Sequence, residues 1–317
     1  MTDVKQEKVS CREAEECLKT GRYQEAIDIY RTLAAASPGE ESLSLALAWA
    51  CHDAGRLEEA ISCFEQLFDR ELSRKIFTGF AYDELVRIYK TGGRYDRLVD
   101  VCERAAQAQP NDPALLGEWA AACLKAGMIG KSIEICEGII ALDPEATATY
   151  CLLGESHLAA GEFALAEKAF HWAAKIDPAA ACAFYGRLAE NYLRLGEQEK
   201  AEKFLRKCLK MSPRDALLLC RLGDCLIGQG KLMAARRAYE KAVSLSPGST
   251  DVLYLRWGQT LASARYHREA ITVLRRALKK GPPFPLHRIR MAESFVALGM
   301  NEMAAQTLSE INPWRDL

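Results

Sequence analysis

One pattern of small, large and polar positions recurs along the chain about every 34 residues. Each copy has a small residue at two places and a large apolar residue four positions after the second; in one copy these are Gly223, Ala235 and Tyr239. Small side chains let two helices approach closely, and a large one fills the space beside them. The pattern therefore predicts two antiparallel helices in every copy.

Glycines and prolines mark the ends of these predicted helices. A glycine recurs at the end of the first helix, where a left-handed C-cap is expected: Gly21, Gly55, Gly93, Gly127, Gly161, Gly196, Gly230 and Gly299. Arg265 takes this place in the eighth copy. A proline closes most second helices and starts the next copy, as Pro144, Pro178 and Pro213 illustrate.

This arrangement resembles the tetratricopeptide repeat family, whose unit is a helix–turn–helix of about 34 residues. The segments YCLLGESHLAAGEFALAEKAFHWAAKIDP and LCRLGDCLIGQGKLMAARRAYEKAVSLSP match it almost throughout. The resemblance implies a single all-α domain, residues 1–317, folded as a right-handed superhelical solenoid with a concave groove. Its nine repeats are expected at residues 7–40, 41–78, 79–112, 113–146, 147–181, 182–215, 216–250, 251–284 and 285–317.

The second repeat departs from the pattern because it lacks its proline and runs on for four more residues. Four residues are about one helical turn, so we expect a longer second helix there. The junction near residues 70–80 is the candidate hinge of the array.

Charge is divided unevenly along the chain, although its 42 Lys and Arg residues nearly balance its 43 Asp and Glu residues. Residues 1–180 carry a net charge of −11 and residues 181–317 a net charge of +10. A field of this kind can steer partners or orient copies of the same chain. Self-assembly through these complementary halves is one functional hypothesis.

Composition narrows the cellular setting. The chain is 49% hydrophobic, which excludes wholesale disorder, yet no apolar run is long enough to span a membrane. The N-terminal residues show no signal-peptide pattern, and twelve cysteines without an export signal indicate a reducing compartment. We therefore expect a cytoplasmic protein.

The resemblance implies that positions 2, 5, 9 and 12 of each first helix line the concave groove. Candidate partner-binding residues at position 9 are Trp49, Arg87, Glu155, Glu190, Asp224 and Gln259. A row of arginines stands at position 6 of the last four repeats: Arg187, Arg221, Arg256 and Arg290. Position 12 is mostly aliphatic, so an apolar floor is expected beside these polar groups.

Each of these candidates has two interpretations. Trp49 is either an aromatic anchor for a partner or ordinary core. The arginines either pair within a helix, where an acidic residue follows three positions later, or grip carboxylates and carbonyls of a partner. The Lys and Asn clamp of chaperone-binding family members and the asparagine ladder of the O-linked sugar transferase are both missing, so neither ligand class is supported.

A basic patch is expected on the second helix of the eighth repeat, at Arg275, Arg276, Lys279 and Lys280. Phosphate-rich partners favour such patches, but few aromatic residues lie among these cations. Nucleic acid is therefore disfavoured. A solvated face, or a docking end for the acidic half of another copy, fits the pattern better.

The sequence offers no enzyme chemistry. It contains no CxxC pair, no glycine-rich phosphate loop and no GxSxG motif, and we predict no catalytic residue, metal or cofactor. The leading hypothesis is a non-enzymatic adaptor that binds one or more partner proteins or peptides in its groove. Its rivals are the self-assembling scaffold and an accessory subunit that positions an enzyme such as a glycosyltransferase.

Overall fold

The computed structural model describes residues 2–75, 77–280 and 285–311, and the side chains within them from Ser10 to Lys279 and from Pro285 to Ile311. These residues form eighteen α-helices and one short 3₁₀ turn, and no strand occurs among them. The fold is an all-α helical repeat solenoid, as the sequence pattern predicts. The last residues of the ninth repeat, residues 312–317, lie outside the described part.

Two compact units divide the chain at residues 160 and 161. The first unit contains four helix pairs followed by one further helix. Its helices are α1 (Thr2–Lys19), α2 (Tyr23–Ala36), α3 (Glu41–Asp53), α4 (Leu57–Arg74), α5 (Phe80–Thr91), α6 (Tyr95–Ala108), α7 (Pro113–Lys125), α8 (Ile129–Leu142) and α9 (Thr147–Ala159).

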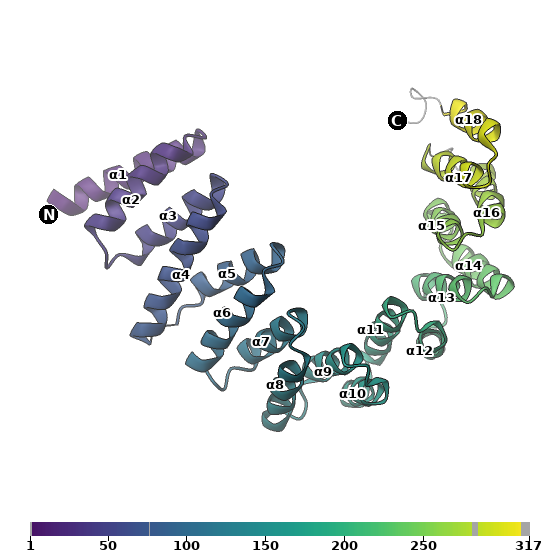
Figure 1. Ribbon diagram of the computed structural model, residues 1–317, viewed down its shortest axis with the longest axis horizontal. Coiled ribbons are helices and arrows are strands. Elements are labelled where there is room, and N and C mark those ends of the chain that lie inside the picture. The colour runs from purple at the N-terminus through teal and green to yellow at the C-terminus, as the bar shows by residue number, and fades with distance from the viewer. Residues whose placement is uncertain (1, 76, 281–284, 312–317) are drawn as a thin grey trace. The chain divides into compact units, whose positions relative to one another are not determined.

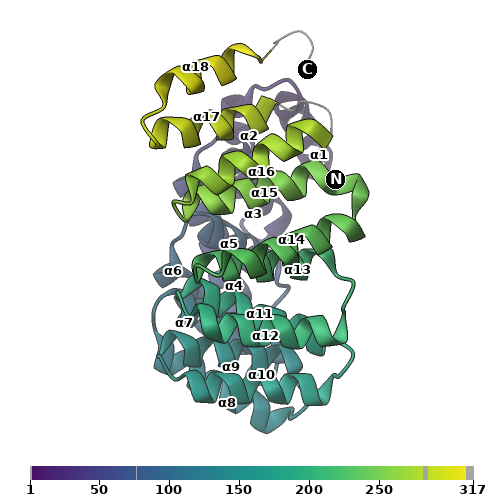
Figure 2. The same cartoon turned by 90° about the vertical axis from the view of Figure 1, so that its right-hand side faces the viewer.

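The second unit begins with a second helix of a repeat and continues with four helix pairs. Its helices are α10 (Phe163–Ile176), α11 (Ala181–Arg194), α12 (Gln198–Met211), α13 (Ala216–Gly228), α14 (Leu232–Leu245), α15 (Thr250–Ser263), α16 (His267–Lys280), α17 (Pro285–Ala297) and α18 (Asn301–Ser309), with η1 at Pro247–Ser249. In this unit α12, α14 and α16 lie on the same side of α11, α13 and α15, and Figure 2 views that side (Figures 1 and 2).

The predicted small and large positions meet inside each helix pair. A Cβ atom added at Gly223 on α13 would lie 2.5 Å from the Tyr239 ring on α14. The equivalent atom at Gly258 on α15 would lie 2.6 Å from Leu274 on α16. Both large residues are fully buried. The two glycines therefore set how closely the helices of these pairs approach.

The eight register glycines all have positive φ, as expected for left-handed C-caps. Arg265 adopts the same conformation, with φ 66°, in the repeat that lacks the glycine. The turn also keeps its helix-capping hydrogen bonds, from the Arg265 N–H to the Ala262 carbonyl and from the Tyr266 N–H to the Leu261 carbonyl. An L-residue held in this region carries a conformational cost that glycine does not.

The four extra residues of the second repeat extend its second helix, as predicted. Helix α4 has 18 residues, whereas α2, α6 and α8 each have 14. Its last turn carries Glu71, a buried carboxylate that accepts hydrogen bonds from the backbone N–H and the hydroxyl of Thr78. These bonds tie α4 to the residues just before α5. The hinge near residues 70–80 stays a prediction, and residue 76 lies outside the described part.

Most cysteines are small core residues, as the repeat register suggests. Cys17, Cys51, Cys102, Cys123, Cys136 and Cys208 are buried, and none of the twelve is in a disulfide. Burial raises the pKa of Cys102 and of Cys136 to about 12. These thiols therefore stay protonated at neutral pH and pack as hydrophobic groups.

Within the described residues, no helix combines the length and the hydropathy needed to cross a membrane.

Candidate interaction surfaces

Trp49 is the centre of a small aromatic and cationic cluster in the first unit. Its half-buried ring meets Phe64 edge-on, with 5.9 Å between ring centroids. The guanidinium of Arg87, the residue at the same position in the next repeat, lies 5.7 Å from the centre of the indole. Arg87 also forms an ion pair with Glu84 at 2.7 Å. Trp49 thus has one edge in the core and one partly open, and its contact with a partner stays a prediction.

The arginine row pairs between repeats in the second unit. Arg221 on α13 lies 2.6 Å from Glu190 on α11, and Arg256 on α15 lies 2.6 Å from Asp224 on α13. Of the two interpretations, pairing with the acidic residue three positions later is therefore not what Arg221 does, because its ion pair is with a residue of another repeat. The side chains reach the preceding helix because α11, α13 and α15 pack side by side, so that position 6 faces position 9 of the previous repeat.

Pairing within one helix does occur at the end of the row, where Arg290 lies 2.9 Å from Glu293 on α17. Arg187 is exposed on α11, and Glu155 is half-buried on α9. Gln259 is half-buried on α15, at the register position 9 that is acidic in the neighbouring repeats. Contacts of these three side chains with a partner stay predictions.

Asp224 is the most highly connected of these acidic groups. It accepts hydrogen bonds from Arg256 Nε at 2.9 Å, from the Thr260 hydroxyl at 2.7 Å and from the Tyr239 hydroxyl. Desolvation alone would lower the pKa of Arg256, but the charge and hydrogen bonds of Asp224 outweigh it and raise that pKa. Burial, reinforced by the Asp224 charge, raises the pKa of Tyr239. The Arg256–Asp224 pair therefore joins α15 to α13, and the Tyr239 hydroxyl connects α14 to the same carboxylate.

A row of exposed aliphatic side chains runs beside these ion pairs. Leu217, Val252 and Leu286 stand at position 2 of α13, α15 and α17, and their exposed fractions are 51%, 65% and 41%. Ile289 and Val296 on α17 are exposed as well. The sequence interpretation missed this row because position 2 was not compared between repeats. A comparison of position 2 between the last three repeats would have revealed three aliphatic residues in a row.

The predicted basic patch lies on α16. Arg275 and Lys279 are exposed, Arg276 is half-buried, and the side chain of Lys280 is outside the described part. Arg276 and Arg236 both approach Glu240 on α14, at 3.6 Å and 2.8 Å. Part of the patch is thus neutralised by the neighbouring helix.

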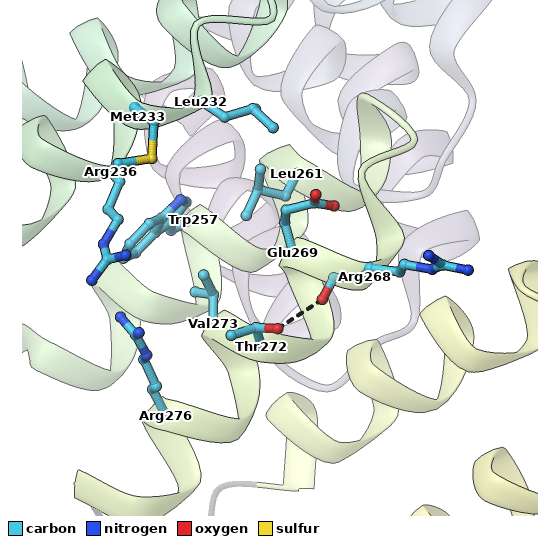
Figure 3. A pocket seen from close by; sticks show the side chains of 10 residues that line it. All are labelled: Leu232, Met233, Arg236, Trp257, Leu261, Arg268, Glu269, Thr272, Val273 and Arg276. Carbon is cyan, nitrogen blue, oxygen red and sulfur yellow. Dashed lines mark hydrogen bonds between the residues drawn. The ribbon is translucent and has the colours of Figure 1, made fainter.

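A pocket of about 260 Å³ lies between α14 and α16 beside this patch. Trp257, Leu261 and Val273 form its apolar side, with the exposed Met233 at its edge. Arg236 and Arg276 lie on one side of Trp257, while Arg268 extends away from it (Figure 3). Glu240 offsets only one of the two positive charges of Arg236 and Arg276, and Glu269 lines the pocket together with Arg268.

A second carboxylate network joins α12 to the turn between α13 and α14. Glu202 on α12 accepts hydrogen bonds from Arg206, Lys231 and Gln229, each at 2.9 Å. Burial raises the pKa of Glu202, but these three donors outweigh it and hold the pKa at about 2. This carboxylate is therefore a structural anion that is not available to bind a partner's cation.

Among the residues from Ser10 to Lys279 and from Pro285 to Ile311, no group of three or more His, Cys, Asp and Glu side chains is arranged to hold a metal ion.

Several solved structures have a similar helical arrangement. The chain is 21% identical to the MamA protein, covering 55% of this chain and 94% of that one with a TM-score of 0.41. It is 26% identical to a thermophilic TPR protein in Thermus thermophilus, covering 56% and 95% with a TM-score of 0.40. A tetratricopeptide repeat protein from Parabacteroides merdae shares 14% identity over 91% and 98%, with a TM-score of 0.42.

The human protein O-mannosyl-transferase TMTC1 is 26% identical over 163 residues, which are 50% of this chain and 18% of that protein. The chain thus spans less than a fifth of the length of this curated relative. Family models described as tetratricopeptide repeat match residues 18–72, 81–114, 183–215 and 216–249. Together with the nine helix pairs and their shared register, these matches show that the chain belongs to the tetratricopeptide repeat family.

Proposed function

We propose that this chain is a non-enzymatic adaptor that binds a segment of a partner protein across the first helices of its second unit. Tetratricopeptide repeats support a role as a protein-interaction scaffold in general. The particular surface is supported by one observation: Leu217, Val252 and Leu286 occupy the same register position on three neighbouring helices and remain exposed. Aligned apolar side chains on a water-facing surface are typical of binding sites.

The ion pairs beside this row supply the polar part of the proposed surface. Arg221–Glu190 and Arg256–Asp224 hold neighbouring helices in register, so the aliphatic row is fixed before a partner arrives. A rigid surface loses less conformational entropy on binding than a flexible one. In this proposal a partner's apolar side chains contact the row, and its backbone polar groups meet the edges of the ion pairs.

The proposal is tested by capture from native cell extract under reducing conditions. Leu217→Asp combined with Val252→Asp places two charges in the row without disturbing the core, because both side chains are exposed. Met233→Asp is the matched control, since Met233 is 65% exposed on α14, outside the row. We expect a retained protein to be lost with the double variant and kept with the control. Loss with Met233→Asp alone would contradict the proposal.

Association between copies of the chain is a second candidate, favoured by the charges of the two units. Residues 1–160 contain 17 basic and 27 acidic residues, and residues 161–317 contain 25 basic and 16 acidic residues. The net charges are therefore −10 and +9. Opposite charges on two parts of one chain favour a heterologous contact between copies.

A role beside an enzyme such as a glycosyltransferase stays a prediction. The human relative is a transferase by name, but the match covers 18% of its length. That segment alone does not assign transferase chemistry, or a transferase partner, to this chain.

A further inference from the structure

The positive charge of the second unit is concentrated on its second helices. Helices α10, α12, α14 and α16 contain 15 Lys and Arg residues against five Asp and Glu residues. The first helices α11, α13, α15 and α17 contain six and four. The face formed by the second helices therefore differs in chemistry from the aliphatic row on the first helices.

A pocket of about 890 Å³ opens on this basic face between α10 and α12. Lys168, Lys175, Lys203 and Lys207 line it, with Glu167 as its one acidic residue. Glu167 is already bound to Lys203, at 2.9 Å. Lys168, Lys175 and Lys207 form no ion pair with any described residue. Three positive charges in one pocket thus lack a protein counter-charge.

Aromatic rings hold two of these lysines in place. The ammonium group of Lys207 lies 3.7 Å from the centre of the Tyr185 ring, and that of Lys175 lies 4.5 Å from the centre of the Trp172 ring. Tyr185 is itself fixed by a hydrogen bond of 2.8 Å between its hydroxyl and Nδ1 of His171. Cation–π contacts therefore keep the two charges at the pocket wall, where a ligand can reach them.

Trp172 adds an apolar element to the charged pocket, because 49% of this large side chain is exposed. Its indole lines the pocket beside the lysines. Tyr185 and Phe204 are buried, so Trp172 is the one open ring among the Trp, Tyr and Phe side chains of the pocket lining, and successive nucleic-acid bases have no run of rings on which to stack. The pocket suits carboxylates together with an apolar side chain.

We propose that the α10–α12 pocket binds an acidic segment of a partner protein, in which glutamate or aspartate side chains flank an apolar residue. The carboxylates pair with Lys168, Lys175 and Lys207, and the apolar side chain lies against Trp172. This surface is separate from the aliphatic row, so the chain can hold two partner segments at once. Charge complementarity selects the partner, and the contact with the indole fixes where along the pocket the partner's apolar side chain binds.

The test uses the full chain and a fluorescently labelled peptide with the repeating sequence Glu-Glu-Leu, followed by fluorescence anisotropy. Lys168→Glu, Lys175→Glu and Lys207→Glu together are expected to weaken binding about tenfold or more. The matched control reverses three exposed, unpaired charges outside the pocket, at Lys210, Arg214 and Lys241. It should change the dissociation constant less than about threefold. Equal losses in both triple variants would reduce the effect to net charge and overturn the proposal.

Two further measurements complete the test. Trp172→Ala should weaken binding of the peptide about threefold or more, because the apolar contact is lost; unchanged affinity would remove the indole from the proposal. A Gln-Gln-Leu peptide should not bind, and a single-stranded oligouridine should bind more weakly than the acidic peptide. Tighter binding of the oligouridine, lost in the lysine variant, would make the pocket a nucleic-acid site and overturn the proposal.

The row variant Leu217→Asp with Val252→Asp separates this proposal from the proposed function. It should leave binding of the Glu-Glu-Leu peptide unchanged, because neither residue lines the α10–α12 pocket. Loss of the peptide only in the lysine variant supports the pocket whatever the capture experiment gives. Loss in the row variant would assign the peptide to the first helices and overturn the separate pocket.

Discussion

Asp224 on α13 accepts two hydrogen bonds from the Arg256 guanidinium on α15, at 2.9 Å from Nε and 2.6 Å from Nη2. The two residues are 32 positions apart, so the pair joins one repeat to the next. Tyr239 and Thr260 bond to the same carboxylate. One acidic side chain thereby connects three helices. Removing it, or removing its partner Arg256, should lower the stability of the second unit.

Replacing Arg256 by alanine should lower the free energy of unfolding by about 1–3 kcal/mol, because the half-buried Asp224 carboxylate loses its counter-charge. Urea unfolding followed by far-UV circular dichroism measures the change. Arg290→Ala is the matched control, since Arg290 pairs with Glu293 within one exposed turn. The Arg290→Ala substitution should lower the free energy of unfolding by less than about 0.5 kcal/mol. Equal costs would show that the bond between repeats adds nothing to stability.

Gly258→Ala should destabilise the chain by about 1–3 kcal/mol, because the new Cβ lies 2.6 Å from Leu274 and the helix pair must move apart. Gly186→Ala is the control, since nothing lies within 4 Å of a Cβ placed there in α11. It should stabilise the chain by about 0.5–1 kcal/mol through helix propensity. Thermal unfolding of the two variants would therefore shift in opposite directions, and shifts of the same sign would contradict the packing scheme.

Arg265→Gly should raise the free energy of unfolding by about 0.5–1 kcal/mol. Arg265 has φ 66°, where glycine is free of the Cβ strain that arginine bears. The converse change, Gly196→Ala at the same register position, should lower stability by about 1 kcal/mol. Chemical denaturation of both variants tests the pair. A loss of stability in Arg265→Gly would mean that the arginine side chain contributes more than its backbone costs.

Glu202→Gln should change how stability depends on pH. The pKa of Glu202 is held at about 2, below its ordinary 4.5, so the ionised form stabilises the fold above about pH 4.5. That contribution is lost as the pH falls from about 4.5 towards 2. The variant should therefore be less stable than wild type by about 1 kcal/mol at neutral pH, and the difference should vanish near pH 2. A constant difference over this range would exclude the depressed pKa.

Association between copies should weaken as salt is added if it is driven by the net charges of −10 and +9 on the two units. Dissolved ions screen the attraction between exposed charges and shorten its range. Sedimentation velocity at about 20 mM and about 500 mM salt compares the particle masses. We expect a larger mass at low salt. A monomer at both concentrations would eliminate the self-assembly candidate and leave the partner-binding proposal in place.

Much of the fold could be predicted from the sequence because the register repeats nine times. The turn at each glycine and the small residues facing Tyr239 and Leu274 follow from side-chain size and backbone freedom, which are local properties. Even the longer α4 follows from counting residues. Arg265 shows how strong this constraint is, because the turn keeps its conformation without its glycine.

The partners of the charged side chains were not predictable in this way. Arg221 has an acidic residue three positions later, yet it pairs with Glu190 on another helix, because flexible side chains choose among neighbours that only packing brings near. Lys168 and Lys175 lie two turns apart on α10, but Lys207 on α12 joins them in one pocket only because the two helices pack near each other. Sequence by itself determined the repeat, its helices and the division of charge, since these depend on composition and period. Tertiary structure alone decided which charges are neutralised and which stay open to a partner, because that depends on distances between helices.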